Sequence, residues 1–366
     1  MALKLPKSKV ELHVHLDGAL RIQTIIDLAK EKQIPLPSYD ENGLRQYVSV
    51  SLDKPSSLQG FLSCFRVFVP VIIDDVVALE RIAHEFCEDQ ASSGVLYCEV
   101  RYCPHLLCTA HNSMMNGRPD DEDNEVPNML LKKGVSPRDV VQAVCRGLHR
   151  GERDFGVKVR SILCCMRPEP EWSLEILSLC KEFSSDGVVG IDLAGDEILG
   201  EIPAMKGHIN AFKEARQLKI HRTVHAGEAA PAASVKEALN ILHAERIGHG
   251  YHVLEDDMLY RRIIDENIHL EACPTSSILT GAVKPCFSTH PLRRFAQDRV
   301  NFSLNSDDPL VCHTTKDLEE KIAINKIGLS PAEITRATFN AARASFLPEN
   351  EKQELIDQLK LVHGIQ

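Results

Sequence analysis

The chain has 366 residues, of which 43% are hydrophobic and 26% are charged, and its formal net charge is −10 at pH 7. These values are typical of a globular protein with a substantial core, and the negative charge disfavours nucleic acid or an anionic membrane surface as a partner, because both would repel it. No stretch approaches the roughly 18 apolar residues of a membrane span, and the amino terminus has basic residues without the apolar run of a secretory signal. We therefore expect a cytoplasmic protein without membrane insertion, and its charge is compatible with a small neutral substrate.

The twelve cysteines are scattered through predicted strands and helices, and no two of them form a Cys-x-x-Cys pair. A thiolate zinc site or a thioredoxin-like redox centre therefore has no support. In a chain of this length without a secretory signal, we expect reduced thiols that are mostly buried.

Apolar runs rich in β-branched residues alternate with amphipathic stretches of helical periodicity. The predicted strands are 9–16, 95–102, 157–166, 188–193, 221–226, 245–249, 268–273 and 299–305. The predicted helices between them include 75–90, 137–154, 173–183, 208–218, 232–243, 255–266 and 316–327. This alternation predicts a parallel sheet, and eight repeats favour closure into a (β/α)8 TIM barrel. A doubly wound open sheet is the alternative, disfavoured because no Gly-x-Gly-x-x-Gly follows the first strand.

Three regions depart from the alternation. Residues 33–72 form a long connection after strand one, in which Leu58, Phe61, Leu62 and Phe65 fall at helical spacing; we expect either an amphipathic helix packed on the barrel or a hydrophobic lid. The acidic stretch 109–134 has no periodicity and is predicted to be a surface loop. Segments 331–345 and 349–362 are predicted to be closing helices, so we expect a single domain over 1–366 with extra helices after strand 1 and at the C-terminus.

The first strand carries two histidines one residue apart, in the run ELHVHLDG at 11–18. His13 and His15 therefore project from one face of the strand, and the leucines and valine between and around them project from the other. Two imidazoles on one face provide two corners of a transition-metal site. The alternative is a half-exposed strand with two solvent-facing histidines.

Three later strands end in the other groups that such a site needs. The fifth ends in TVHAGE, the sixth in IGHG and the eighth in SLNSDDP. In a parallel barrel all these ends meet on one face, so His13, His15, His225 and one of Asp307 and Asp308 would supply three nitrogens and an oxygen, a set that suits zinc with room for water. Taken singly, these motifs are equally typical of a core histidine, a turn or a helix N-cap; their occurrence together favours the metal site.

The same strand ends offer groups for proton transfer. Glu228 follows His225 by three residues, and a carboxyl group in a closed pocket has its pKa raised by desolvation, so that it can be a protonated acid at pH 7. A metal would make hydroxide available at neutral pH. His249 and the second aspartate of the 307–308 pair are candidates for orienting it.

The motifs HVHLDG, DLAGDE (192–197), TVHAGE, IGHG and SLNSDDP, in this order along nearly the whole chain, resemble the adenosine deaminases of the amidohydrolase superfamily. The runs SLDKP (51–55), VRYCPHLL (100–107) and KVRSILCCMR (158–167) are similar to the vertebrate cytosolic members in particular. The fold of that family is a (β/α)8 barrel, in agreement with the strand count.

The resemblance implies one Zn2+ per chain, held by His13, His15, His225 and Asp307. It implies that Glu228 protonates N1 of the purine and that His249 and Asp308 position the attacking water and help to deprotonate it. The products would be inosine or 2′-deoxyinosine and ammonia, in purine nucleoside metabolism.

The resemblance also implies how the substrate is held. Asp308 would face N7, the Gly195 amide would donate to N3, and Asp17 would accept a hydrogen bond from the ribose 5′-hydroxyl. His15 would contribute to the substrate site as well as to the metal site. The apolar wall over the substrate would consist of Leu58, Phe61 and Phe65.

Some features differ from related enzymes. The zinc nucleobase deaminases with His-x-Glu and Pro-Cys-x-x-Cys signatures have another fold, and neither signature occurs here. Many two-metal amidohydrolases carry a lysine at the end of strand four, where this chain has none, so a single metal is expected. Thr275 and Val283 stand where the vertebrate members have tryptophan, which is expected to alter packing near the barrel mouth.

Two other functions compete with this interpretation. One is deamination of AMP or an N6-alkylated AMP, disfavoured because a 5′-phosphate would meet the carboxylate of Asp17. The other is a zinc-binding module without catalysis, disfavoured because Glu228, His249 and Asp308 are all present. A monomer is expected, and no cell-surface partner is identified from the sequence.

Overall fold

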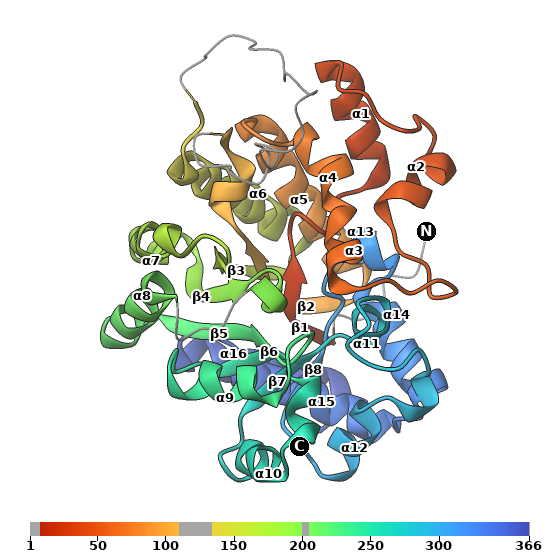
Figure 1. The fold of residues 1–366 in the computed structure, drawn as a ribbon, viewed down its shortest axis with the longest axis vertical. Coiled ribbons are helices and arrows are strands. Elements are labelled where there is room, and N and C mark those ends of the chain that lie inside the picture. Colours follow the sequence, from red (N-terminus) through yellow and green to blue (C-terminus); the bar gives the residue numbers. More distant parts are fainter. Residues whose placement is uncertain (1–7, 110–133, 200–204, 366) are drawn as a thin grey trace.

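The computed structural model describes residues 8–109, 134–199 and 205–365. Within them, eight parallel strands form one sheet whose spatial order follows the chain (Figure 1). The strands are β1 (Lys9–His15), β2 (Val95–Tyr102), β3 (Lys158–Met166), β4 (Val188–Ala194), β5 (His221–Ala226), β6 (Arg246–His249), β7 (His269–Ala272) and β8 (Phe302–Leu304). All eight predicted strands are present, close to their predicted bounds.

The barrel closes between β1 and the residues that follow β8. Val14 and Asp307 form a parallel bridge. The His15 amide donates to the Asp307 carbonyl at 2.8 Å, and the Asp307 amide donates to the His13 carbonyl at 3.1 Å. The predicted TIM barrel is therefore confirmed, and the open-sheet alternative is wrong.

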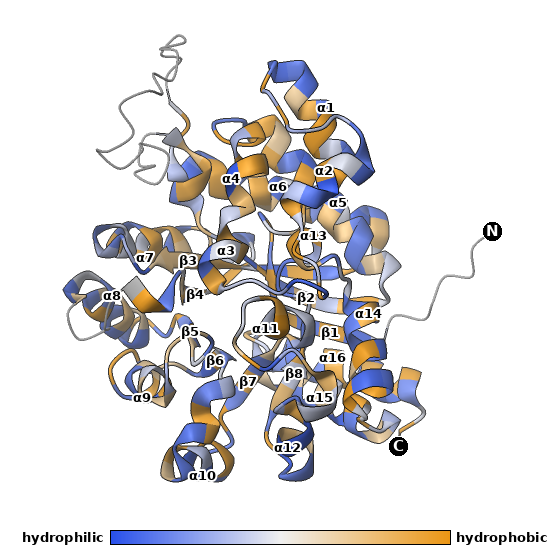
Figure 2. Ribbon diagram, turned by 45° about the vertical axis from the view of Figure 1, so that its right-hand side comes forward, coloured by the Kyte–Doolittle hydropathy of each residue, from blue (hydrophilic) through white to orange (hydrophobic). Residues whose placement is uncertain are grey.

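The connecting helices surround the strands, and each mixes hydrophobic and hydrophilic residues, as amphipathic helices do (Figure 2). They include α5 (Val76–Ser92), α6 (Pro137–Phe155), α7 (Ser173–Glu182), α8 (Lys206–Gln217), α9 (Ala232–Asn240), α10 (Asp257–Asp265), α12 (Leu292–Gln297) and α14 (Lys316–Ile322). The sequence signals for helix starts operate as expected. At α6, Ser136 forms a capping box with Asp139, and Pro137 occupies the first helical position.

Two predicted elements differ in extent from those observed. The eighth strand begins at Phe302 rather than 299, because Arg299 has a φ of 57° and so cannot belong to a strand. The helix predicted over 316–327 is an α-helix only to Ile322 and continues as a π-helix over Ala323–Ile327.

Helix α1 (Ile22–Lys32) follows β1, and the predicted connection 33–72 contains α2 (Glu41–Val48), α3 (Leu58–Ser63) and α4 (Phe65–Phe68). The hydrophobic stripe is thus divided between α3 and α4. Helix α3 lies at the carboxyl-terminal rim of the barrel (Figure 1), where the Ser56 amide donates to the Leu279 carbonyl at 2.9 Å and Gln59 Nε2 donates to Asp196 Oδ2 at 3.1 Å.

The predicted closing helices are α15 (Pro331–Ala344) and α16 (Glu349–His363), which share a hydrophobic cluster with β1 and β2. Most of the acidic stretch 109–134 lies outside the described residues. Among the described helices, none has the length and apolarity that a membrane crossing requires.

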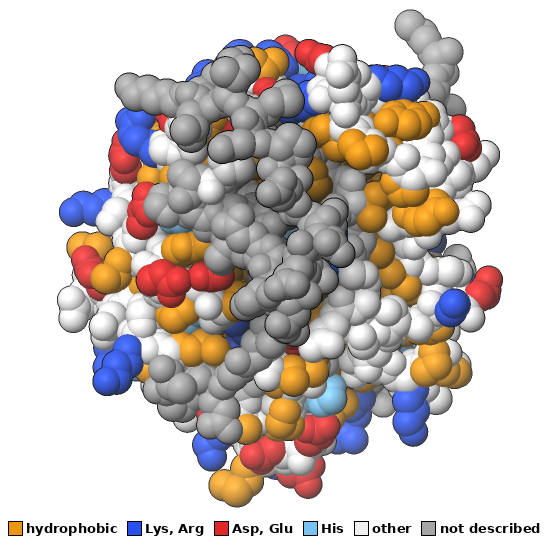
Figure 3. All heavy atoms as spheres, turned by 45° about the horizontal axis from the view of Figure 1, so that its top comes forward, with side chains coloured by type: hydrophobic (Ala, Val, Ile, Leu, Met, Phe, Trp, Pro, Cys, Tyr) orange, Lys and Arg blue, Asp and Glu red, His pale blue; other side chains and the backbone are white. Residues whose placement is uncertain are grey.

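All twelve cysteines lie in the described ranges and are free, and only Cys286 is exposed, as predicted for reduced thiols. Where Figure 3 shows described residues, basic side chains are scattered among acidic and hydrophobic ones.

Candidate active site

Four predicted metal ligands come together at the carboxyl-terminal rim of the barrel. His13 and His15 end β1, His225 lies on β5, and Asp307 follows β8. His13 Nε2 is 3.0 Å and His15 Nε2 is 3.5 Å from Asp307 Oδ1. His15 Nε2 is 3.2 Å from His225 Nε2. Residues nearly 300 positions apart in the chain therefore present nitrogen and oxygen atoms to one point.

This donor set fits a zinc ion. Ligand atoms about 2.0–2.1 Å from a tetrahedral zinc lie about 3.3 Å from one another, and the three separations above bracket that value. His13 Nε2 is buried and faces Asp307 Oδ1, another predicted ligand, without the geometry of a hydrogen bond. A buried nitrogen in this position has a lone pair available to a metal.

His249 also belongs to this group. One ligand atom from each of His13, His225, His249 and Asp307 lies within 4.8 Å of the others. The sequence assigned His249 to water activation rather than to the metal, whereas its position makes it a fourth nitrogen donor beside the four predicted ligands. Its φ of 64° places its backbone in the left-handed region, a strain that persists only where the surroundings enforce it.

Gly248 explains why the histidines can approach so closely. A Cβ at this position would lie 3.0 Å from His13 Cε1 and 3.2 Å from His225 Cα. Any side chain there would push the candidate ligands apart. The glycine of the IGHG motif is therefore required by packing.

Two carboxylates contact the ring nitrogens of the candidate ligands His13 and His225 that do not face the centre of the site. His13 Nδ1 lies 2.8 Å from Glu271 Oε2, and His225 Nδ1 lies 2.9 Å from Asp192 Oδ2. Each carboxylate fixes the ring orientation and directs Nε2 toward the centre of the site. Metal-binding histidines generally have such partners.

These carboxylates belong to a buried set of charges that we call the interior ion cluster: Glu99, Arg101, Asp192, Arg246 and Glu271. Arg101 contacts Asp192 Oδ2 and Glu271 Oε2, each at 2.8 Å. Burial opposes ionisation of Glu271, but Arg101 and Arg246 outweigh it and hold the pKa of this carboxyl well below its usual range. The acceptors of the histidines therefore stay charged.

Sequence reasoning assigned no role to the interior ion cluster. The available signal was a charged residue within an apolar strand, as in CEVRY, IDLA and HLEA. Inward-facing charges in a packed barrel must pair with one another, because an unpaired buried charge is too costly. The sequence alone does not show which residues pair.

Asp307 is held on several sides. Its φ is 62°, and Ser276 Oγ donates to its Oδ2 at 2.6 Å. The preceding residue, Ser306, donates through its amide and its hydroxyl to Glu11 Oε1, both at 2.7 Å. Burial opposes ionisation of Asp307, but the facing His13 holds the pKa of its carboxyl well below the usual range.

Glu228 lies beside the candidate ligands. It is buried, and its Oε2 is 3.5 Å from His249 Nε2. Desolvation, followed by the negative charges of Asp307 and Glu197, raises the pKa of Glu228 well above its usual range. This shift favours the protonated form of the side chain, the form that the hypothesis of an acid role requires.

Asp308 and Asp17 are buried carboxylates at the same rim, and each has an oxygen without a hydrogen-bond partner. Burial and the charge of Asp307 raise the pKa of Asp308 well above its usual range. Burial raises the pKa of Asp17 to about 6. A Cβ on Gly18 would lie 1.8 Å from Asp308 Oδ1, so the glycine of HVHLDG leaves the space that Asp308 occupies.

The remaining predicted substrate residues border this rim. Gly195 follows β4 with a φ of 97°, which favours glycine. Leu58 and Phe61 of α3 are buried, whereas Phe65 is half-buried and its ring centroid lies 5.2 Å from that of Phe68. The α3 side chains are thus placed at the rim, and Phe65 packs beside the neighbouring helix.

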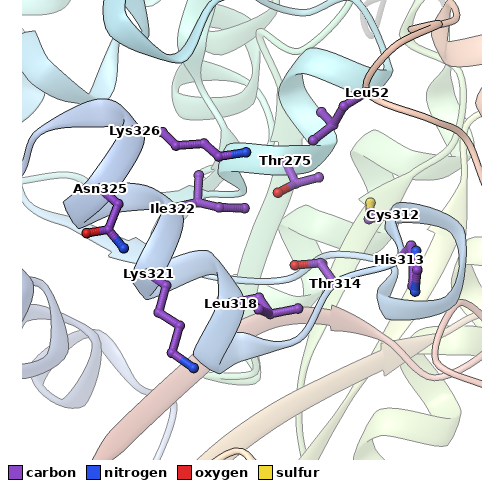
Figure 4. A pocket seen from close by; sticks show the side chains of 10 residues that line it. All are labelled: Leu52, Thr275, Cys312, His313, Thr314, Leu318, Lys321, Ile322, Asn325 and Lys326. Atoms are coloured by element: carbon purple, nitrogen blue, oxygen red, sulfur yellow. The ribbon is translucent and has the colours of Figure 1, made fainter.

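A separate cavity of about 280 Å3 lies beside α11 (Pro274–Leu279) and α14 (Figure 4). Thr275, Leu52 and Ile322 contribute to its lining. Thr275 is one of the two positions where the sequence predicts a difference in packing from the vertebrate members. The next residue, Ser276, donates to Asp307.

Known proteins share both the barrel and much of the sequence. An adenine deaminase from Arthrobacter aurescens superimposes with a TM-score of 0.82 and 27% sequence identity, covering 98% of this chain and 99% of that one. An N6-mAMP deaminase from Arabidopsis superimposes with a TM-score of 0.77 and 27% identity, covering 98% of both chains. The fold and the arrangement of its strand ends are those of the amidohydrolase-fold deaminases.

The family model described as adenosine deaminase matches residues 8–362. An adenosine deaminase from Xenopus tropicalis is 48% identical over 360 residues, which cover 98% of this chain and 96% of that protein. The chain therefore belongs to the adenosine deaminase family, and it is a hydrolase that acts on a carbon–nitrogen bond. The resemblance identified from the motifs is confirmed.

Proposed function

We propose that this enzyme catalyses the zinc-dependent hydrolysis of adenosine and 2′-deoxyadenosine to inosine and 2′-deoxyinosine with release of ammonia, as a step of purine nucleoside metabolism. The observation that carries the proposal is the convergence of three histidines and Asp307 beside the buried acid Glu228. A nitrogen-and-oxygen donor set with the spacing of a tetrahedral site supports zinc, and family membership supports the substrate.

One zinc ion per chain would be held by His13, His15, His225 and Asp307. When bound, it would supply hydroxide at neutral pH, because zinc lowers the pKa of water from about 15.7 to about 7. The carboxylates of Glu271 and Asp192 would keep the His13 and His225 rings in their binding orientation.

Glu228 would give its proton to N1 of the purine. The raised pKa keeps the proton on the carboxyl group until the ring nitrogen takes it, and protonation of N1 makes C6 more electrophilic. His249, whose Nε2 is 3.5 Å from Glu228 Oε2, would hold the attacking oxygen against C6 together with Asp308. Because burial lowers the pKa of His249 well below its usual range, its ring is neutral and can accept a proton.

The substrate would be oriented by groups around the rim. Asp308 would face N7, the Gly195 amide would donate to N3, and Asp17 would accept from the 5′-hydroxyl. Leu58, Phe61 and Phe65 would cover the purine and exclude water. These contacts address the base and the 5′ position, so both the ribose and the 2′-deoxyribose forms are expected to react.

The test is a spectrophotometric assay of purified protein with adenosine, in which deamination changes the purine absorbance. Activity is expected with about one zinc per chain, to disappear on treatment with a strong chelator, and to return on addition of zinc. An active protein without bound metal would overturn the metal assignment. A zinc-loaded protein without any effect on adenosine would favour the non-catalytic module.

The nucleotide is the competing substrate, since the Arabidopsis relative is an N6-mAMP deaminase. The buried Asp17 disfavours a nucleotide here. With a pKa of about 6, this carboxyl is mostly ionised at pH 7 and would repel a 5′-phosphate. We expect kcat/KM for AMP to be at least 100-fold below that for adenosine, and comparable values would overturn the nucleoside assignment.

The single-domain organisation over 1–366, the monomeric state and the cytoplasmic location remain predictions. The rate effect of Thr275 and Val283 also remains a prediction. A cell-surface partner remains unidentified.

A further inference from the structure

One carboxylate holds the segment that carries the acid. Glu197 Oε2 accepts hydrogen bonds from three consecutive backbone amides, those of Glu228 at 2.9 Å, Ala229 at 2.7 Å and Ala230 at 2.9 Å. Glu197 is buried, with 5% of its surface exposed. Successive amides that point to one place form an anion-binding concavity, and here the anion is a side chain of the same protein.

The other contacts of this segment leave the three amides to Glu197. Arg167 Nη2 donates to the His225 carbonyl at 2.6 Å, and the Gly227 amide donates to Ser234 Oγ at 2.8 Å. His225 is further held by Asp192. Before residue 228 the segment is held mainly by Arg167, Asp192 and Ser234, of which Ser234 Oγ also donates to Glu197 Oε1 at 3.4 Å. The amides of residues 228–230 are held by Glu197.

The second carboxylate oxygen of Glu197 has longer contacts, with Ser234 Oγ at 3.4 Å and with Arg167. Arg167 Nη2 is 3.7 Å from Glu197 Oε1, and its close acceptor is the His225 carbonyl. Glu197 could act in two ways. If it balances the charge of Arg167, its negative charge is what matters. If it anchors the three amides, what matters is that its side chain is long enough to place one oxygen within hydrogen-bond distance of all three.

Building on the proposed function, we propose that Glu197 is a positioning residue, whose side chain anchors the amides of 228–230 and so holds the Glu228 carboxyl at N1 of the substrate. The hydrogen bonds and the ion pair of Glu197 among the described residues do not include the side chain of a candidate metal ligand. A misplacement of a catalytic group by about 1 Å can cost about 100-fold in rate, so loss of the anchor is expected to lower kcat while the metal remains bound.

Two variants of Glu197 distinguish the effect of its side-chain length from the effect of its negative charge. Glu197→Gln keeps the length and one carbonyl oxygen for the three amides but removes the charge. Glu197→Asp keeps the charge but withdraws the oxygens by one methylene group. Zinc-loaded proteins are compared for kcat and KM with adenosine, zinc content, melting temperature and hydrogen exchange of the amides of 228–230.

We expect Glu197→Gln to keep kcat within about 3-fold and to keep the three amides protected. We expect Glu197→Asp and Glu197→Ala to lower kcat about 10- to 100-fold, with KM within 2-fold, unchanged zinc content and faster exchange at these amides. If the alanine variant does not fold, the Asp and Gln variants carry the test. The proposal is overturned if Glu197→Asp is as active as Glu197→Gln, or if kcat falls without faster exchange.

Glu152 provides the matched control. Glu152 Oε1 also accepts a hydrogen bond from a backbone amide, that of Val159 at 2.7 Å, and it contacts Arg160 at 2.8 Å. These contacts lie at the amino-terminal end of β3, away from the candidate active site. Glu152→Asp is expected to leave kcat within 2-fold. An equal loss of kcat in this variant would indicate general destabilisation and would overturn the positioning role. If wild-type protein does not deaminate adenosine, the proposed function fails, while the exchange data still report on the anchor.

Discussion

The interior ion cluster and the carboxyl groups at the rim of the barrel are both buried, but they differ in whether a basic side chain pairs with them. In the interior ion cluster, Arg101 and Arg246 each contact two carboxylates, Arg101 at 2.8 Å and Arg246 at 2.6–2.7 Å. At the rim, within the described residues, neither Asp17 nor Asp308 forms an ion pair with a basic side chain, and the charged groups that act on Asp308 are mainly other carboxylates. Both sets are buried, so burial does not distinguish them.

The difference is visible in the direction of the pKa shifts. Arginines outweigh burial and lower the pKa of Glu271, whereas burial beside other carboxylates raises the pKa of Glu228 and Asp308. Paired charges stay ionised and give the barrel a fixed interior. Among the rim acids, the shifts of Glu228 and Asp308 favour their protonated forms, which remain available to a substrate. The comparison predicts that rim changes alter rate and interior changes alter stability.

The largest expected effect is at the rim. Glu228→Gln has nearly the shape of the wild type but cannot transfer the carboxylic proton, so kcat is expected to fall about 10²- to 10⁴-fold. Zinc content and melting temperature are expected to stay unchanged. Steady-state kinetics and metal analysis check this, and wild-type turnover would remove the proton-transfer role.

In the interior, Arg101→Met is expected to lower the free energy of unfolding by about 3–5 kcal/mol, because Asp192 and Glu271 would lose their shared partner inside the barrel. Urea denaturation measures the change. Arg138→Met is the control, since the Arg138–Glu182 pair is exposed and should contribute less than about 1 kcal/mol. Equal effects of the two variants would contradict the distinction between paired interior charges and the surface.

Glu319 is a buried carboxyl group that has neutral hydrogen-bond donors. It accepts from the Thr275 amide at 3.0 Å and from the Thr314 hydroxyl at 2.6 Å. Burial raises its pKa from 4.5 to about 7. The native state therefore binds this proton more tightly than the unfolded state, so the carboxyl reduces stability progressively as pH rises from about 4.5 to 7, and the cost stays constant above 7.

Glu319→Gln should remove that cost while keeping the shape. The variant is expected to be more stable than wild type at pH 8 by up to about 3 kcal/mol, because each pKa unit corresponds to about 1.4 kcal/mol. The gain should disappear near pH 4.5. Denaturation at several pH values measures it, and a gain that does not depend on pH would contradict the assignment.

The smallest expected effect is at Glu271, which belongs to the interior ion cluster and also contacts the candidate ligand His13. Glu271→Gln keeps an oxygen acceptor for His13 but removes the negative charge of that acceptor, so zinc affinity is expected to fall about 10- to 100-fold. Competition with a chelator of known affinity measures the change. With saturating zinc, kcat should return to within a few-fold of wild type. Unchanged affinity would show that Glu271 serves only the interior ion cluster.

The sequence predicts the features that depend on local order. Strand and helix alternation follows from periodicity, and His13, His225, Glu228 and Asp307 are recognisable because each ends a strand in a distinctive motif. A parallel barrel then brings these ends together without further information. This is why the barrel and the convergence of its candidate ligands could be predicted before any coordinates.

The contacts that support the site could not be predicted in the same way. Glu271 reaches His13 across 258 positions of the chain, and this pairing depends on barrel geometry. Glu197 lies within the recognisable DLAGDE motif, yet its role depends on where residues 228–230 turn. The place of His249 within the metal group likewise depends on its left-handed backbone, which no local pattern specified.

The strand pairing that closes the barrel passes through the candidate ligands themselves, since the backbones of His13, His15 and Asp307 exchange its hydrogen bonds. The backbone bridge between β1 and the residues after β8 thus lies where a cation would sit. An ion that binds only this closed form raises the free energy of unfolding by about 1.4 kcal/mol for each tenfold excess over its dissociation constant. Metal supply would then govern the lifetime of the folded enzyme as well as its turnover.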